Sequence, residues 1–91
     1  MVSLEQIVAS LVLPIDARDA LKPRLAESIS LWRAGEEGIA LENLCDNLDD
    51  FGVAIDSPTC DELIRLCQRF HVSPKRIALL DTLRSPTARP H

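Results

Sequence analysis

The chain has 91 residues, enough for one domain with a single core of modest size. Hydrophobic residues make up 46% and charged residues 26%, a balance that excludes a disordered or low-complexity protein. The net charge of −4 and the scatter of the ten basic residues exclude direct binding of nucleic acid, which needs a concentrated basic surface.

Targeting and cofactor signals are missing from the sequence. No apolar run approaches the roughly 20 residues that a membrane span needs, and MVSLEQ has an acid where a signal peptide carries bases. We therefore expect a cytoplasmic protein with no membrane association. Cys45, Cys60 and Cys67 form no C-x-x-C pair, so we expect buried thiols. Cys67 and His71 have a metal-like spacing, but Pro74 indicates that the helix ends near His71, and we expect no metal and no cofactor.

The first helix signals are a capping box and a proline. Ser3 and Gln6 have the spacing of a capping box, and apolar residues then recur at helical spacing until Pro14 stops the helix. Pro23 is tolerated best in a first turn, so a second helix is expected to start near Lys22. It should end at Gly35, a natural left-handed cap.

A third helix is expected from about Glu36 to Phe51, with one apolar side and one acidic side. Ser57-Pro58 and Ser73-Pro74 each predict a further helix start, with serine as the N-cap and proline in the first turn. The sequence therefore predicts an all-α fold, a small bundle of four to five helices. Residues 1–84 should form this single helical domain, and residues 85–91, SPTARPH, a flexible C-terminal tail without apolar periodicity.

Acidic residues are concentrated in the middle of the chain. Between Arg33 and Arg65 there are nine acids and no base, whereas the remaining chain holds all ten bases and five acids. Six of the nine lie in GEEGIALENLCDNLDDFG, residues 35–52. Like charges one turn apart cost about 0.2–0.5 kcal/mol per pair in a helix, so stability alone does not favour this pattern. A basic partner would compensate for it; a solvated acidic face, or pairing with Arg33, Arg65 and Arg69, is the alternative.

The stretch WRAGEEGIALENLCDNL, from Trp32 to Leu48, resembles the signature of MafI-type immunity proteins. These bacterial proteins are encoded beside polymorphic or contact-dependent growth-inhibition toxins. The family pattern is G-E-x-G-hydrophobic-A-L-E-x-L-C-D/E-x-L, and the resemblance extends over roughly residues 25–83. The chain departs from the family in having no tyrosine after the motif, and Ser73-Pro74-Lys75-Arg76 replaces a late aromatic-containing helix.

The resemblance implies an antitoxin, a cytoplasmic immunity protein that catalyses nothing and occludes the C-terminal domain of a cognate toxin. Many such toxins are nucleases, whose substrate sites are basic because they hold phosphates. An acidic helical face can occupy such a site in a toxin–immunity complex. The partner-binding residues that we expect are Glu36, Glu37, Glu42, Asn43, Asp46, Asn47, Asp49 and Asp50.

Two other functions fit the sequence less well. Acyl carrier proteins are also small acidic four-helix domains, and Asp56-Ser57 before a helix resembles their attachment site, so a carrier protein modified at Ser57 is the alternative. Pro58 stands where that site has leucine or methionine, and Ser57 also fits an N-cap. An enzyme is not expected, because His71 and His91 are the only histidines and no catalytic arrangement surrounds them.

Overall fold

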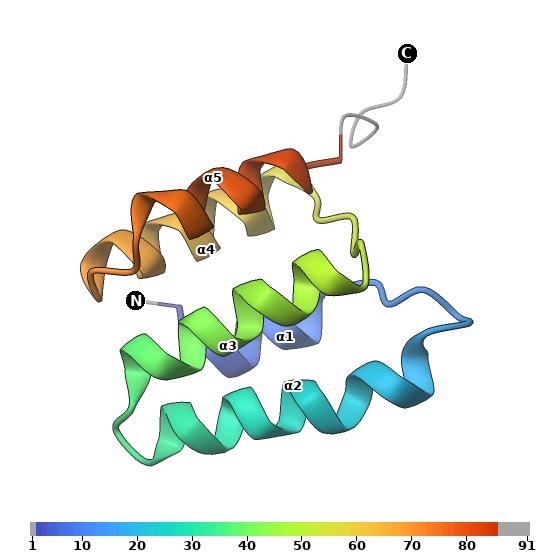
Figure 1. Cartoon of the computed structure of the whole chain (residues 1–91), viewed down its shortest axis with the longest axis horizontal. Helices are drawn as coiled ribbons and strands as arrows, with labels where there is room; N and C mark the ends of the chain where they lie inside the picture. Colours follow the sequence, from blue (N-terminus) through green and yellow to red (C-terminus); the bar gives the residue numbers. More distant parts are fainter. Residues whose placement is uncertain (1, 86–91) are drawn as a thin grey trace.

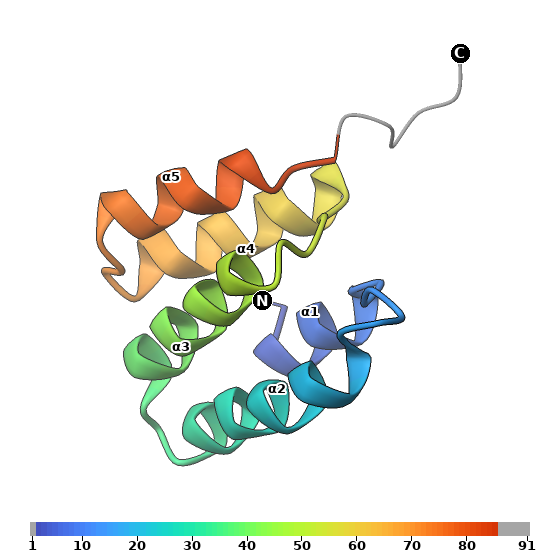
Figure 2. The same ribbon diagram turned by 45° about the vertical axis from the view of Figure 1, so that its right-hand side comes forward.

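The part of the chain that the computed structural model describes, residues 2–85, folds as five helices (Figure 1). Their order is α1 (Leu4–Ser10), α2 (Arg18–Arg33), α3 (Glu37–Asp50), α4 (Ser57–Arg69) and α5 (Pro74–Thr82). α3 packs between α2 and α5, and α1 lies behind it against α2 and α4 (Figures 1 and 2). The predicted all-α bundle is confirmed, with five helices. Within the described range no helix is both long and apolar enough to cross a membrane.

The core is aliphatic, and aromatic residues make up only 3% of the sequence. α3 contributes most to it, and its fully buried apolar residues are Ala40, Leu41, Leu44, Cys45 and Leu48. Two of the three aromatic side chains, Trp32 of α2 and Phe70 after α4, meet edge to face with ring centroids 5.5 Å apart. This contact closes the bundle at the end where α3 begins.

The predicted helix starts are confirmed at two serines and are wrong at two other positions. Ser3 forms the capping box with Gln6, and the Ser73 side chain accepts from the Arg76 N–H at 3.4 Å. The start of α4 was predicted one residue too late: Asp56 is the N-cap and accepts from the Thr59 N–H at 3.4 Å. Ser57 is the first helical residue, and its hydroxyl accepts a hydrogen bond from Arg84 instead of capping the helix.

α2 begins at Arg18, four residues before the predicted start at Lys22. Pro23 removes a single N–H, the one that would pair with the carbonyl of Asp19, so the helix continues through it. A turn closed by the Ala17 N–H and the Pro14 carbonyl, 3.1 Å apart, leads into the helix. Burial of Leu21 then fixes the first turn against the core.

Three helices end with the same backbone arrangement. Gly35, Gly52 and His71 follow α2, α3 and α4 and have φ of +83°, +60° and +61°. In each case the next N–H donates to the carbonyl five residues before it, at 3.0, 3.0 and 2.9 Å. This is the left-handed helix cap expected at glycine, and His71 adopts it with a side chain.

The segment after α3 joins the end of α5 without forming a strand. The Ile55 N–H donates to the Leu83 carbonyl at 2.9 Å, and the Ser85 N–H donates to the Ile55 carbonyl at 2.7 Å. Ser85, the first residue of the predicted tail, is therefore bonded to the body of the fold. Residues 86–91 lie outside the described residues.

Candidate functional site

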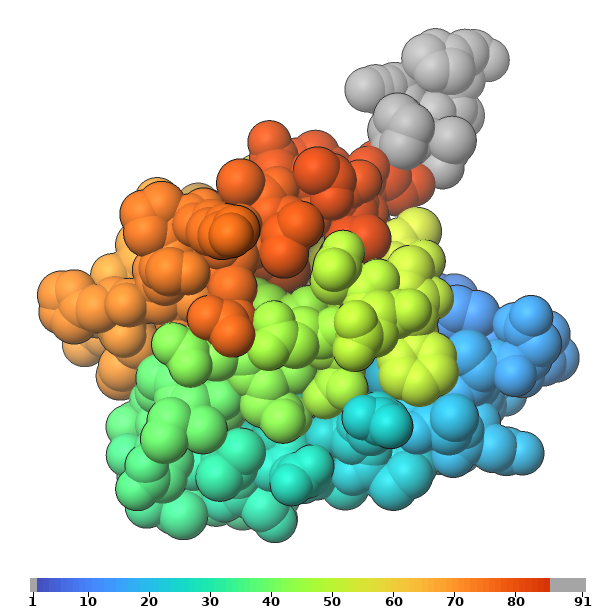
Figure 3. Space-filling model, in the orientation of Figure 1, coloured from blue at the N-terminus to red at the C-terminus, as the bar shows by residue number. Residues whose placement is uncertain are grey.

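Four predicted binding residues share the outward side of α3. At 100° per residue, Glu42, Asp46, Asp49 and Asp50 fall within an arc of about 100°, opposite the buried leucines. Asp46, Asp49 and Asp50 are exposed and Glu42 is half-buried. We call these four residues the α3 acidic strip. In Figure 3 α3 crosses the middle of the visible face, with α5 above it and α2 below it.

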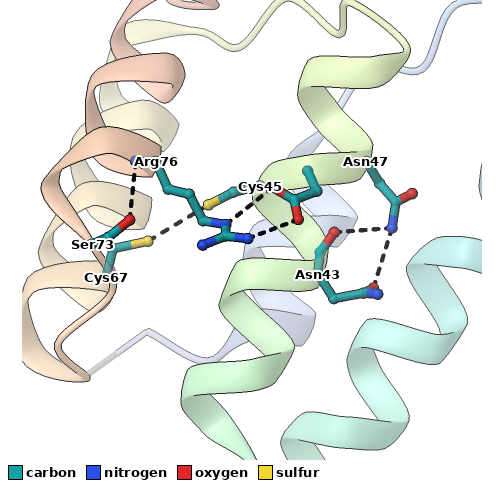
Figure 4. A network of polar contacts seen from close by, with 7 residues as sticks. Asn43, Cys45, Asn47, Cys67, Ser73 and Arg76 are labelled. Atoms are coloured by element: carbon teal, nitrogen blue, oxygen red, sulfur yellow. Dashed lines mark hydrogen bonds and ion pairs between the residues drawn. The ribbon is translucent and has the colours of Figure 1, made fainter.

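One carboxylate of the strip is already paired within the domain. Arg76 of α5 donates from Nε to Asp46 Oδ1 at 3.0 Å and from Nη2 to Asp46 Oδ2 at 3.1 Å (Figure 4). The hydrogen bonds and the charge of Asp46 raise the pKa of Arg76. Within residues 2–85, the other five acids of the acidic stretch make no ion pair.

The arginines expected as internal partners do not neutralise the strip. Arg33 pairs with Glu5 of α1. Arg65 and Arg69 of α4 make no ion pair with any described residue. Arg24 of α2 lies beside the end of the strip with its guanidinium 5.8 Å from the ring centre of Phe51. Folding therefore leaves the strip bordered by Arg24 and Arg76 and mostly unmatched.

Glu36 and Glu37 lie apart from the strip, at the beginning of α3. Glu36 occupies the N-cap position without capping the helix through its side chain, and it is exposed. Glu37 is half-buried in the first turn, where a negative charge is favourable to the helix dipole. At 1.5 Å per residue they stand about 20 Å from Asp50 along the helix axis. The structure thus brings together four of the six predicted acids.

The two predicted asparagines belong to the contact between α2 and α3. Asn47 is only 5% exposed, and its Nδ2 donates to the carbonyl and to Oδ1 of Asn43, at 3.0 and 3.2 Å (Figure 4). The buried Ser28 of α2 donates to Asn43 Oδ1 at 2.5 Å. Arg24 donates to Asn47 Oδ1 at 3.5 Å. Asn47 is therefore a structural residue inside the domain, contrary to the expectation that it faces a partner.

The three thiols are buried and free, as predicted. Cys45 of α3 and Cys67 of α4 have their sulfurs 3.8 Å apart, and Cys60 contacts the Leu80 carbonyl at 3.5 Å. The hydrogen bond with Cys67, together with burial, raises the pKa of Cys45, and the same bond lowers that of Cys67. Among residues 2–85, no three histidine, cysteine or acidic side chains are grouped as a metal site requires.

Ser57, the site of the alternative carrier function, is held by Arg84. Arg84 Nη1 donates to Ser57 Oγ at 2.6 Å and also contacts Asp61 at 2.9 Å. Its Nη2 pairs with Asp81 at 3.0 Å. The hydrogen bonds with Asp61 and then Asp81 raise the pKa of Arg84. The hydroxyl thus takes part in joining the end of α5 to the start of α4.

Sequence reasoning missed an exposed apolar loop between α1 and α2. Val12 is 82% exposed and Ile15 is 85% exposed, the highest values among the large apolar side chains of residues 2–85. The signal was the apolar run LVLPI, which continues past the last periodic position of α1 up to and beyond Pro14. Ile39, near the start of α3, is also exposed, at 53%.

Comparison with known proteins found no match among protein-family models, curated proteins or solved structures. Function is therefore inferred from the surface of the domain and from the sequence resemblance at Trp32–Leu48.

Proposed function

We propose that this chain is an immunity protein that neutralises a cognate bacterial toxin by covering a basic surface of the toxin's C-terminal domain. The α3 acidic strip makes the contact, and the toxin domain is a nuclease with a cationic substrate site. The single observation that carries the proposal is the unmatched charge of the α3 acidic strip: within residues 2–85, Glu42, Asp49 and Asp50 lack an ion pair and only Asp46 has one. Outside residues 35–52, Glu5, Asp61 and Asp81 each contact an arginine, whereas Asp16, Asp19, Glu27, Asp56 and Glu62 make no ion pair within residues 2–85.

The position of the strip supports this proposal. Asp49 and Asp50 lie in the last turn of α3, where the helix dipole is negative, so each carboxylate weakens the helix by about 0.3–1 kcal/mol. No basic residue occurs in that last turn. A cationic partner would remove this penalty on contact. At longer range the same charges would attract the partner and raise the association rate.

The proposed mechanism is occlusion and needs no chemistry from the chain itself. A nuclease holds phosphates with lysine and arginine, and carboxylates can satisfy the same groups. Bound over that site or its rim, the domain excludes the nucleic acid. The G-E-x-G-x-A-L-E-x-L-C resemblance supports the same assignment, and the cytoplasm is the compartment where such protection acts.

Binding to the polypeptide encoded immediately upstream tests this function. Purified chain and the C-terminal domain of that polypeptide should form a complex, and the complex should abolish the toxicity of the domain in cells. The association rate should fall at least about tenfold as salt rises from about 0.05 to 0.5 M, because exposed charges are screened. Glu27→Lys, a reversal of an exposed acid on α2, is the control and should leave association nearly unchanged. Absence of a complex at low salt contradicts the proposal.

A further inference from the structure

The loop between α1 and α2, residues 11–17, is held in a fixed shape. Leu11 and Leu13 pack against the core, so the side chain between them, Val12, points outward. The Leu11 N–H donates to the Val8 carbonyl at 3.1 Å, and the Ala17 N–H donates to the Pro14 carbonyl at 3.1 Å. A loop fixed by two inward leucines and two backbone bonds loses little conformational entropy when a partner binds it.

The two outward side chains do not contribute to the stability of the domain. Ile15 is the second residue of the turn closed by Pro14 and Ala17, a position that polar residues and proline normally occupy. Val12 and Ile15 keep more than four-fifths of their surface exposed. Most of the surface of these two side chains can therefore be buried only in a contact with another molecule, which would gain hydrophobic free energy.

Carboxylates adjoin this apolar loop. Val12 lines a hollow of about 240 Å³ together with Ala54, Ile55 and Asp56, which follow α3. Figures 1 and 3 show the C-terminal end of α3, which carries Asp49 and Asp50, on the same side of the molecule as the loop. Asp16 follows Ile15 directly. These four acids, Asp16, Asp49, Asp50 and Asp56, are exposed and make no ion pair within residues 2–85.

We propose that Val12 and Ile15 are the apolar anchors of the partner contact. They enter an apolar recess on the partner, and Asp16, Asp49 and Asp50 pair with basic residues at the rim of that recess. An apolar centre within a charged rim is the usual arrangement of a protein–protein contact. The inference rests on the proposed function and deepens it: the partner surface is basic with an apolar recess, rather than a uniformly cationic groove.

The acids near the loop outnumber the exposed Arg18 that begins α2, and this excess of negative charge selects the occupant over two others. A second copy of the chain would bring the same acids against these acids, and like charges would repel. An anionic lipid surface would be repelled in the same way. A cationic protein surface would gain binding free energy both from the apolar side chains of the loop region and from its carboxylates.

The double variant Val12→Ser/Ile15→Ser tests the inference on the full chain. With the C-terminal domain of the upstream polypeptide as the probe, Kd should rise about 100-fold, mainly through faster dissociation, because two anchors leave the buried centre of the contact. The salt dependence of the association rate should persist, since every carboxylate remains. The matched control is Ile39→Ser, which removes an exposed isoleucine about 16 Å along α3 from Asp50 and should change Kd less than about threefold.

The other possible results distinguish a folding defect, a wrong loop contact and a wrong proposed function. Thermal unfolding of the double variant should match the wild type, which shows that lost binding is not lost folding. Wild-type affinity in the double variant, or an equal loss in Ile39→Ser, overturns the loop contact and leaves the proposed function standing. A wild-type chain that forms no complex overturns both proposals. A wild-type dimer that the double variant converts to a monomer assigns the loop to a second copy and overturns the inference.

Discussion

Arg76 holds the carboxylate of Asp46 with two parallel hydrogen bonds, at 3.0 and 3.1 Å, and so joins α5 to the outward side of α3. Ser73 caps α5 three residues earlier and fixes the turn from which Arg76 extends. The charge of Glu42, one turn before Asp46, also acts on Arg76 and helps to raise its pKa. The α3 acidic strip is therefore balanced near its middle and unbalanced at its C-terminal end, Asp49 and Asp50.

Neutralising the unpaired acids of the strip should affect binding differently from neutralising the paired one. Asp49→Asn/Asp50→Asn should slow association with the partner about tenfold at low salt, because two unmatched charges are lost. Asp46→Asn should slow association less, because it removes one negative charge where the double variant removes two. Stopped-flow association kinetics at low and high salt measure both. A larger effect from Asp46→Asn would show that Arg76 releases Asp46 to the partner.

The same double variant should unfold at a higher urea concentration than the wild type. Removing two carboxylates from the last turn of α3 relieves their repulsion with the helix dipole, worth about 0.3–1 kcal/mol each. A gain in stability together with a loss of association would separate the roles of these acids in folding and in binding.

Asn47 should affect stability rather than the partner contact. Asn47→Ala removes the buried amide that bonds to the carbonyl and Oδ1 of Asn43 and leaves Arg24 without that acceptor. The free energy of unfolding should fall by about 1–3 kcal/mol, the cost of breaking buried hydrogen bonds. Urea unfolding measures it, and the exposed control three residues away, Asp50→Asn, should raise the free energy of unfolding slightly instead of lowering it. An unchanged midpoint would contradict the structural role.

The local signals in the sequence determined most of the fold. Ser3 and Ser73 cap helices where predicted, and Gly35 and Gly52 end them, because each of these effects depends on residues within one or two turns. The start of α4 differed by one residue because Asp56 and Ser57 are both capable caps. In the fold the Ser57 hydroxyl is taken up by Arg84, a contact 27 residues away along the chain that no local pattern indicates.

The sequence predicts which acids lie on one side of α3, but it does not predict which side chains they pair with. The spacing of Glu42, Asp46, Asp49 and Asp50 places them on one helix side from sequence alone. That Arg76 reaches Asp46, and that Asn47 turns toward α2, depends on how α5 and α2 pack against α3. The run LVLPI indicates an apolar loop from sequence alone, but which of its side chains are exposed depends on packing, since Leu11 and Leu13 contact the core and Val12 and Ile15 do not.

The Cys45–Cys67 pair should make the domain less stable at alkaline pH. In the unfolded chain both thiols ionise above about pH 8.5. In the fold their hydrogen bond and burial raise the pKa of Cys45, so the pair carries at most one negative charge. Unfolding then releases a proton from Cys45 above about pH 8.5, so stability falls as pH rises above that value. The lowered pKa of Cys67 acts in the opposite sense below that pH, and above it Cys67 is ionised in both states, so the downward slope there comes from Cys45.

The comparison is with Cys45→Ser/Cys67→Ser, which keeps two hydroxyls that do not ionise in this range. Urea unfolding at pH 7, 9 and 10 under a reducing agent gives the free energy of unfolding at each pH. This free energy should fall with pH more steeply in the wild type, by up to about 1.4 kcal/mol per pH unit. Cys60 is present in both proteins, so its contribution cancels. Equal slopes would mean that the two thiols ionise as readily in the fold as in the unfolded chain.

His71→Gly should stabilise the domain. His71 ends α4 with φ of +61°, and a side chain in this left-handed conformation costs roughly 1–2 kcal/mol relative to glycine. Glycine also loses more entropy on folding, about 0.4–1 kcal/mol, so the net gain should reach about 1 kcal/mol. His71→Ala should bring no such gain, because alanine meets the same strain. Gly35→Ala and Gly52→Ala, at φ of +83° and +60°, should instead lower stability by about 1 kcal/mol. Urea unfolding of the four variants tests this. A His71→Gly protein less stable than wild type would show that the histidine side chain contributes contacts worth more than the strain it imposes.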